Sequence, residues 1–141
     1  MIKAQLRHQL HILRTIVTSA LLLIGVSYCA VSPVTQAKMD EFARTIPSCS
    51  SDNDCSVKWA AARSWIEQSS DYPIQGDSDT RIYASNMIIS HSGVGVVVNL
   101  VAANGSGNYQ IVADMECFSA NNCPELWDKM VDFNRTVNRA Q

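Results

Sequence analysis

Two short cysteine loops of equal length constrain this 141-residue chain more than any other feature. Five residues separate Cys49 from Cys55, and five residues also separate Cys117 from Cys123. If Cys29 is removed or acylated during export, these four thiols remain, and even sets of cysteines in exported chains usually form disulfides. Of the three connectivities that four cysteines allow, the repeated spacing favours local pairing, 49 with 55 and 117 with 123.

A zinc site built from the same four thiolates is the alternative. The members of zinc-binding cysteine pairs normally lie two to four residues apart, whereas the spacing here is five. His91 is the only histidine beyond the N-terminal segment, so a zinc triad of histidines is excluded as well. We therefore expect disulfides, no metal and no cofactor.

The first 37 residues have the three-part layout of a secretory signal. A basic region up to Arg14 precedes an apolar stretch over 15–31 and a short polar stretch that ends at Ala37. Small residues at the end of that stretch favour cleavage after Ala37. Residues 38–141 would then form one exported domain, which is the number of domains that this length allows.

A second interpretation places the processing site at Cys29. Val26-Ser27-Tyr28-Cys29 resembles a bacterial lipoprotein box, in which the cysteine is acylated, although Tyr28 stands where that pattern has Gly, Ala or Ser. A retained membrane anchor is the third interpretation, because the apolar run approaches the ~20 residues that span a bilayer. In all three cases the domain lies outside the cytosol and meets the membrane only through its leader or a lipid anchor. We expect a periplasmic location, with lipid-anchored and secreted forms as alternatives.

The charge of the exported part argues against nucleic acid as a partner. Residues 38–141 carry eight Lys and Arg and thirteen Asp and Glu, which gives a net charge of −5. Binding to phosphates requires a concentrated basic face. The sequence contains no such face.

Apolar residues at helical spacing predict two helices in the first half of the exported part. The first is short and ends at Pro47. The second follows the first cysteine loop, with Asp52 or Asp54 as its N-cap, and ends before Pro73, because proline cannot continue a helix. We expect the tryptophans in the core and not on a ligand platform: Trp59, Trp65 and Trp127.

The periodicity then changes to that of β-strands. Four strands are expected, near residues 73–76, 80–90, 94–103 and 108–117. A third helix follows, with Asn122 or Cys123 as its cap and Pro124 in its first turn. The expected fold is α+β, an antiparallel sheet of three to four strands with the N- and C-terminal helices on one face, stapled by disulfides.

The sequence contains no complete catalytic signature. His91 lies in an expected turn between serines, without an identifiable acid or nucleophile elbow. Asp114 and Glu116 project from one strand face, and Asp77 and Asp79 precede the second strand, a pattern that can divide acid and base roles. Solubilising charge is the simpler interpretation, so the catalytic residues stay unknown and an enzyme is not favoured.

One face of the expected sheet carries more apolar side chains than an open face should. If Val94, Val96, Val98 and Leu100 point toward the helices, the residues between them point away. We expect this second face to present six side chains: Tyr83, Met87, Ile89, Val97, Val101 and Val112. Apolar patches of this kind mark partner or ligand surfaces.

Lys58-Trp59-Ala60-Ala61 and Trp65-Ile66, followed by Tyr72-Pro73-Ile74-Gln75 and Ser78-Asp79-Thr80, resemble a small family of bacterial envelope proteins. In that family a tryptophan-bearing helix enters a sheet through a comparable segment, and many members have lipoprotein-type leaders. The family has no assigned biochemical activity. The resemblance therefore implies an envelope protein and transfers no catalytic residues.

We accordingly expect an exported bacterial envelope protein that is a non-enzymatic binding or accessory module and uses its apolar sheet face. Its partner would be an envelope protein or another envelope component, and a homo-oligomer is compatible with the same face. An enzyme acting on cell-envelope polymers and a secreted inhibitor or effector are the alternatives.

Overall fold

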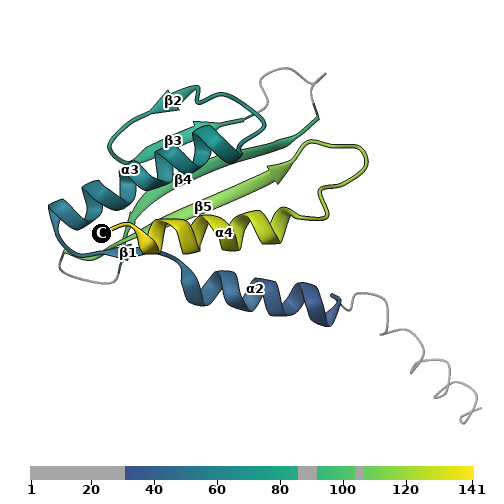
Figure 1. Ribbon diagram of the computed structural model, residues 1–141, viewed down its shortest axis with the longest axis horizontal. Helices are drawn as coiled ribbons and strands as arrows, with labels where there is room; N and C mark the ends of the chain where they lie inside the picture. The colour runs from purple at the N-terminus through teal and green to yellow at the C-terminus, as the bar shows by residue number, and fades with distance from the viewer. Residues whose placement is uncertain (1–30, 86–91, 104–106) are drawn as a thin grey trace, which may run out of the picture. The chain divides into compact units, whose positions relative to one another are not determined.

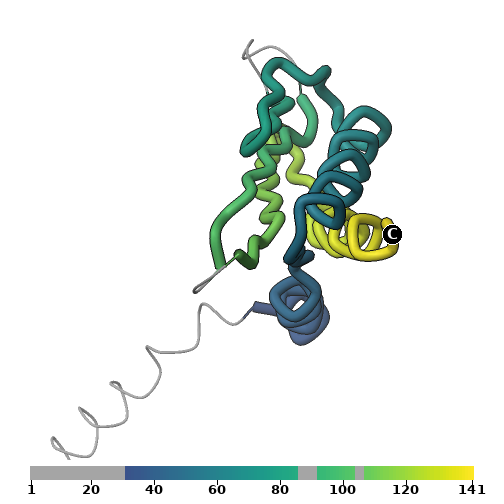
Figure 2. Tube along the Cα trace, turned by 90° about the vertical axis from the view of Figure 1, so that its left-hand side faces the viewer, coloured from purple at the N-terminus to yellow at the C-terminus, as the bar shows by residue number. Residues whose placement is uncertain are grey.

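The structure is a computed structural model that describes residues 31–85, 92–103 and 107–141 (Figure 1). Residues Pro33–Gln141 form one compact unit. Its elements are α2 (Pro33–Thr45), β1 (Ser48–Cys49), α3 (Asp52–Ser69), β2 (Gly76–Asp77), β3 (Arg81–Ala84), β4 (Val94–Ala102), β5 (Tyr109–Cys117) and α4 (Leu126–Arg139). The α+β class is confirmed, with an antiparallel sheet and the two helices α3 and α4 on one of its faces (Figure 2).

The sheet has five strands in the order β1-β5-β4-β3-β2, one more than the upper limit expected from the sequence. Its centre is the β4–β5 pair, which runs in register from Val94 opposite Cys117 to Ala102 opposite Tyr109. Strand β1 was not predicted, because a strand of two residues is too short to show alternation. The strand expected near 73–76 is β2, displaced to Gly76–Asp77, and β3 ends at Ala84 within the described part of the expected strand 80–90.

Helix α3 begins where the sequence predicts it, but its N-cap is a different residue. The Ser51 hydroxyl accepts a hydrogen bond from the Asp54 backbone N–H at 3.2 Å. Asp52 and Asp54, the predicted caps, lie in the first turn. Their negative charges stabilise the N-terminus of the helix there without capping it.

Helix α4 begins later than predicted. Asn122 has a φ of 63°, and the chain turns there in the left-handed conformation that asparagine tolerates better than most residues. Pro124 consequently precedes the helix, and Glu125 occupies the N-cap position without a side-chain hydrogen bond. The predictions that Asn122 or Cys123 caps the helix and that Pro124 lies in its first turn were therefore wrong.

The core lies between the sheet and helices α3 and α4. Trp65 and Phe133 join the two helices through an edge-to-face contact with ring centroids 5.3 Å apart. Trp59 and Trp65 are buried, as predicted, and Trp127 is half-buried against Phe42. The other large side chains that are almost fully buried come from both layers: Ile66, Ile82, Ile111, Val96, Val98 and Val137.

Helix α2 packs against α4 and is held there by two asparagine side chains. Asn134 donates a hydrogen bond to the Phe42 carbonyl at 3.0 Å, and Asn138 donates one to the Thr45 carbonyl at 2.8 Å. These bonds satisfy carbonyls in the last turn of α2, where no backbone N–H of the helix is left to donate to them; the Phe42 carbonyl also accepts a bond from the Thr45 hydroxyl. The buried Asn134 Oδ1 has no hydrogen-bond partner among the described residues, so the site favours asparagine for its amide donor.

Both disulfides pair locally, as the spacing predicts. The Cys49–Cys55 bond joins β1 to the first turns of α3, and the Cys117–Cys123 bond joins the end of β5 to the loop before α4. All four thiols are used, which excludes the zinc alternative for these residues. Disulfides persist in oxidising compartments, so the two bonds indicate an environment outside the reducing cytosol.

Removing either disulfide should destabilise the domain. Replacing both members of one pair with alanine (Cys49→Ala with Cys55→Ala, or Cys117→Ala with Cys123→Ala) should lower the free energy of unfolding by about 2 kcal/mol, because each short covalent loop restricts the unfolded chain. Urea unfolding followed by tryptophan fluorescence measures the change. Ser56→Ala, at an exposed site on α3, is the control, and double variants as stable as this control would contradict the prediction.

Candidate functional site

The sheet face opposite α3 and α4 is here called the outer face. Figure 2 shows both helices on one side of the sheet and no described helix on the other. Val94, Val96 and Val98 point toward the helices and are at most 5% exposed. Side chains alternate along a strand, so Val97 and Val101 of β4 belong to the outer face.

The register of the strands brings four apolar side chains of the outer face together. Tyr83 on β3 lies directly opposite Val97 on β4, and Val97 lies opposite Asp114 on β5. Val112 is therefore the diagonal neighbour of both Val97 and Val101, within reach of direct contact. We call Tyr83, Val97, Val112 and Val101 the apolar band; Tyr83 is 38% exposed and Val101 is 46% exposed. The half-buried Asn99, opposite Val112, lies between Val97 and Val101 on the same face and is its polar member.

Charged side chains lie on opposite sides of the apolar band. Asp114 and Glu116 project from β5, whereas Arg81 projects from β3, and all three residues are exposed. The Arg81 guanidinium lies over the Tyr83 ring, 5.8 Å from its centroid. Within the described parts of the chain, no ion pair joins any of these three charges to another side chain. The outer face is thus acidic along one strand and basic along the other.

Two glycines allow aromatic rings to approach the backbone on the outer face. A Cβ atom at Gly76 would lie 2.0 Å from the Tyr83 ring, and one at Gly95 would lie 2.7 Å from the Phe118 ring. Phe118 also makes an edge-to-face contact with Tyr72, with centroids 5.9 Å apart. The Tyr83 ring therefore extends over Gly76 of β2, and the Phe118 ring lies over Gly95 at the end of the face.

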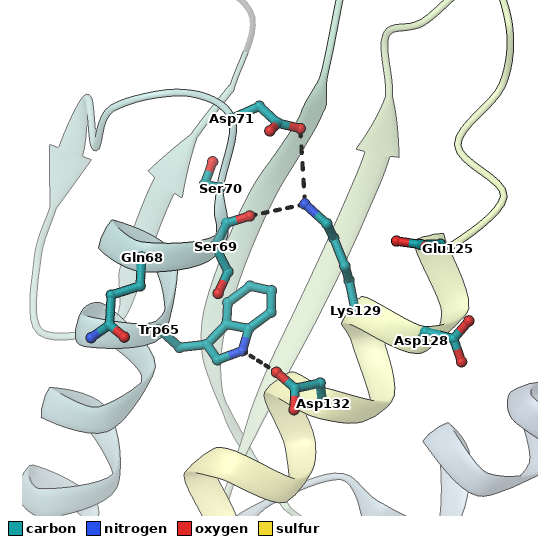
Figure 3. Close-up of a pocket in the computed structure, with 9 residues that line it drawn as sticks. All are labelled: Trp65, Gln68, Ser69, Ser70, Asp71, Glu125, Asp128, Lys129 and Asp132. Atoms are coloured by element: carbon teal, nitrogen blue, oxygen red, sulfur yellow. Dashed lines mark hydrogen bonds and ion pairs between the residues drawn. The ribbon is translucent and has the colours of Figure 1, made fainter.

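A polar hollow of about 470 Å³ lies elsewhere, between the C-terminal end of α3 and the first turns of α4 (Figure 3). Lys129 donates a hydrogen bond to the Ser69 carbonyl at 3.0 Å, and its Nζ lies 3.9 Å from Asp71 Oδ2. Asp71 Oδ2 accepts a hydrogen bond from the Val94 N–H at 2.7 Å. Lys129 of α4 therefore contacts the end of α3 directly and the start of β4 through Asp71. No local sequence pattern indicates these contacts.

Half of the remaining lining residues of the polar hollow are acidic. Asp132 accepts a hydrogen bond from the Trp65 indole N–H at 2.8 Å, and Glu125 and Asp128 are exposed. This charge disfavours anionic ligands. Among the residues that the structure describes, no group of three His, Cys, Asp or Glu side chains is arranged to hold a metal ion.

The carboxylates that the sequence offers for catalysis do not converge. Asp77 accepts hydrogen bonds from both Nε and Nη2 of Arg63, the second at 2.8 Å, and this pairing lowers the pKa of Asp77. Asp79 lies in the turn between β2 and β3, whereas Asp114 and Glu116 lie on β5. None of the last three lines the polar hollow.

Four of the residues that the sequence singles out cannot be placed. Cys29, Met87, Ile89 and His91 lie outside the described residues. Of the six apolar residues expected on the second face, the four described ones form the apolar band.

No helix within the described ranges is long and apolar enough to cross a membrane. Comparisons of the chain with protein-family models, with curated proteins and with solved structures found no match. Fold and site together define a small disulfide-stapled α+β domain with a partly apolar sheet face that no described helix covers.

Acidification should weaken the contact between α3 and β2. Because Arg63 lowers the pKa of Asp77, their ion pair stabilises the fold above the ordinary carboxyl pKa of about 4, and this contribution is lost as the pH falls through the lowered pKa. The two side chains are 37% and 35% exposed, which limits the contribution to less than about 1 kcal/mol.

Asp77→Asn should therefore flatten the decline in stability between about pH 5 and pH 2, measured by urea unfolding across that range. Asp114→Asn is the matched control, because Asp114 has no ion-pair partner among the described residues. Identical pH profiles for Asp77→Asn and the wild type would show that the pair does not contribute.

Proposed function

We propose that this protein is an exported envelope protein and a non-enzymatic binding module whose outer face docks another protein. The observation that carries the proposal is the apolar band, which no described helix covers. The open face of an antiparallel sheet is normally polar, and an apolar patch on a folded domain often marks an interaction site. Unpaired charges beside the band add the electrostatic component of a docking surface.

The shape of the outer face favours a protein over a small molecule. Sites for small ligands are concave and bury most of the ligand surface. The band instead lies across the exposed face of a sheet and takes its residues from three strands. A surface of this kind complements the surface of another protein.

The compartment that we propose rests on the two disulfides. The two disulfides support an oxidising environment, and the periplasm is the compartment that we propose. An enzyme acting on envelope polymers is the weaker alternative, because Asp79, Asp114 and Glu116 do not converge on one cleft. A secreted effector would accumulate in the culture medium, whereas an envelope module stays with the cell.

Photo-crosslinking in cells tests the docking surface. A photoreactive amino acid in place of Val97 should give a defined protein adduct in envelope fractions, because Val97 lies in the apolar band. The same amino acid in place of Glu67, an exposed residue of α3, is the control and should give none. Immunoblotting and mass spectrometry identify the adduct, and equal yields from the two positions, or no adduct from Val97, would refute the proposal.

The N-terminal processing site bears on how the module is held in the envelope. Helix α2 begins at Pro33, so cleavage after Ala37 would remove the first part of this helix. The contacts that dock α2 on α4 include an ion pair from Lys38, a ring contact from Phe42 and the hydrogen bond to the Thr45 carbonyl. All of these would persist after the cut. We therefore propose a product that begins at Lys38.

The intact mass of the processed protein tests this proposal. The expected mass corresponds to residues 38–141 with two disulfides and no acyl group. Reduction should add the mass of four hydrogen atoms, which serves as an internal control for the disulfides. A mass that begins at Cys29 and includes acyl chains would overturn the proposal and show that the domain is tethered to a membrane.

A further inference from the structure

We propose that the protein docked on the outer face is a second copy of this chain, so that two outer faces pack together in a symmetric dimer. This inference rests on the proposed function, because it names the partner of the same surface. The distribution of charge across β3, β4 and β5 carries it.

The apolar band has an acidic side and a basic side. Asp114 is opposite Val97, which is opposite Tyr83, so these three residues form one row across the sheet. The Arg81 guanidinium lies over the Tyr83 ring and therefore near the same row. One row thus carries a carboxylate over β5 and a guanidinium over β3, separated by the valine of β4.

Two outer faces can meet about a twofold axis in the plane between them, running either along the strands or across them. An axis along β4 places β5 of each copy over β3 of the other. Asp114 of one copy then faces Tyr83 and Arg81 of the second copy, and the reverse contact forms at the same time. Arg81 and Asp114, which form no ion pair within the described part of one copy, thus pair with Asp114 and Arg81 of the second copy.

An axis across the strands gives the opposite result. It places β5 over β5 and β3 over β3, so that Asp114 and Glu116 of one copy face a strand of the second copy that carries acidic side chains and no basic one. The two acidic strands then repel each other, which disfavours this arrangement. The charge pattern therefore selects one of the two orientations, the one along the strands, and aligned sheets of this kind pack about 10 Å apart.

The apolar band matches the same axis. Val97 and Val101 belong to β4, so each lies close to the axis and meets its own counterpart. Tyr83 and Val112 lie on opposite sides of β4, so Tyr83 of one copy comes beside Val112 of the second copy. Asn99 lies between Val97 and Val101 on β4 and would also meet its own counterpart, where the two amide side chains can hydrogen-bond to each other. The dimer would bury the four side chains of the band on both sides of this polar pair.

The size of the face predicts a weak dimer. With strands about 4.8 Å apart and about 3.3 Å of length per residue, the five strands have a projected area of roughly 400 Å². Stable, specific interfaces bury about 800 Å² on each partner. We therefore expect a dissociation constant in the micromolar range or above, within reach of sedimentation velocity at high protein concentration.

Charge reversal tests the pairing. Arg81→Asp and Asp114→Arg should each raise the dissociation constant of the dimer by about tenfold or more, because each brings like charges together twice across the axis. An equimolar mixture of the two variants should associate again, since the acidic side chain at position 81 of one faces the basic side chain at position 114 of the other. Glu67→Arg, on α3, is the matched control and should dimerise like the wild type.

Sedimentation velocity of the purified, oxidised protein at concentrations from about 10 µM to 1 mM measures each association. Circular dichroism and thermal unfolding check that the single variants are folded, and renewed association in the mixture is an independent check. A wild type that stays monomeric at about 1 mM, or a mixture that associates no better than the single variants, would overturn the dimer.

The outcomes separate this inference from the proposed function. An adduct between two copies from the photoreactive amino acid at Val97 supports both. A monomeric wild type that still forms an adduct with a different protein overturns the dimer and leaves the docking surface standing. The absence of any adduct together with a monomeric wild type overturns both.

Discussion

The alternation of side chains along β4 is the constraint on which the rest of the structure depends. Val94, Val96 and Val98 fill the core beneath α3 and α4, and burying a valine contributes about 1.5 kcal/mol or more. Val97 must then point the other way, because a one-residue shift in register would exchange the two faces. Helices α3 and α4 both lie on one side of the sheet, so that face supplies the packing, and the other face is the one to which we assign the proposed interaction.

Local patterns predicted most of this fold, because its main elements follow from periodicity within short segments. The alternation along β5 and the apolar stripes of α3 and α4 need no information from distant residues. The two-residue strand β1 shows no alternation of its own and pairs with β5 through long-range hydrogen bonds. The start of α4 was also predicted too early. The chain turns at Asn122, within the second cysteine loop, in the left-handed conformation, and the helix begins only after this turn.

The site was predictable only in part, for a related reason. The direction of Val97 and Val101 follows from the pattern of β4 alone. The separation of Arg81 from Asp114 and Glu116 does not, because it depends on which residues of three strands lie opposite one another. Lys129 illustrates the same limit, since its bonds to Ser69 and Asp71 span about half of the domain sequence.

If the dimer is weak, the oligomeric state of the protein depends on how its N-terminal segment is processed. A product that begins at Lys38 diffuses in three dimensions and pairs only when its concentration approaches the dissociation constant. Copies acylated at Cys29 would share one membrane surface, and confinement of this kind raises the effective concentration without any new contact. Helix α2 begins at Pro33 and is held to α4 by Asn134 and Asn138, so only three residues would separate the acylated cysteine from the folded domain. Processing would then determine the oligomeric state as well as the location of the same folded domain.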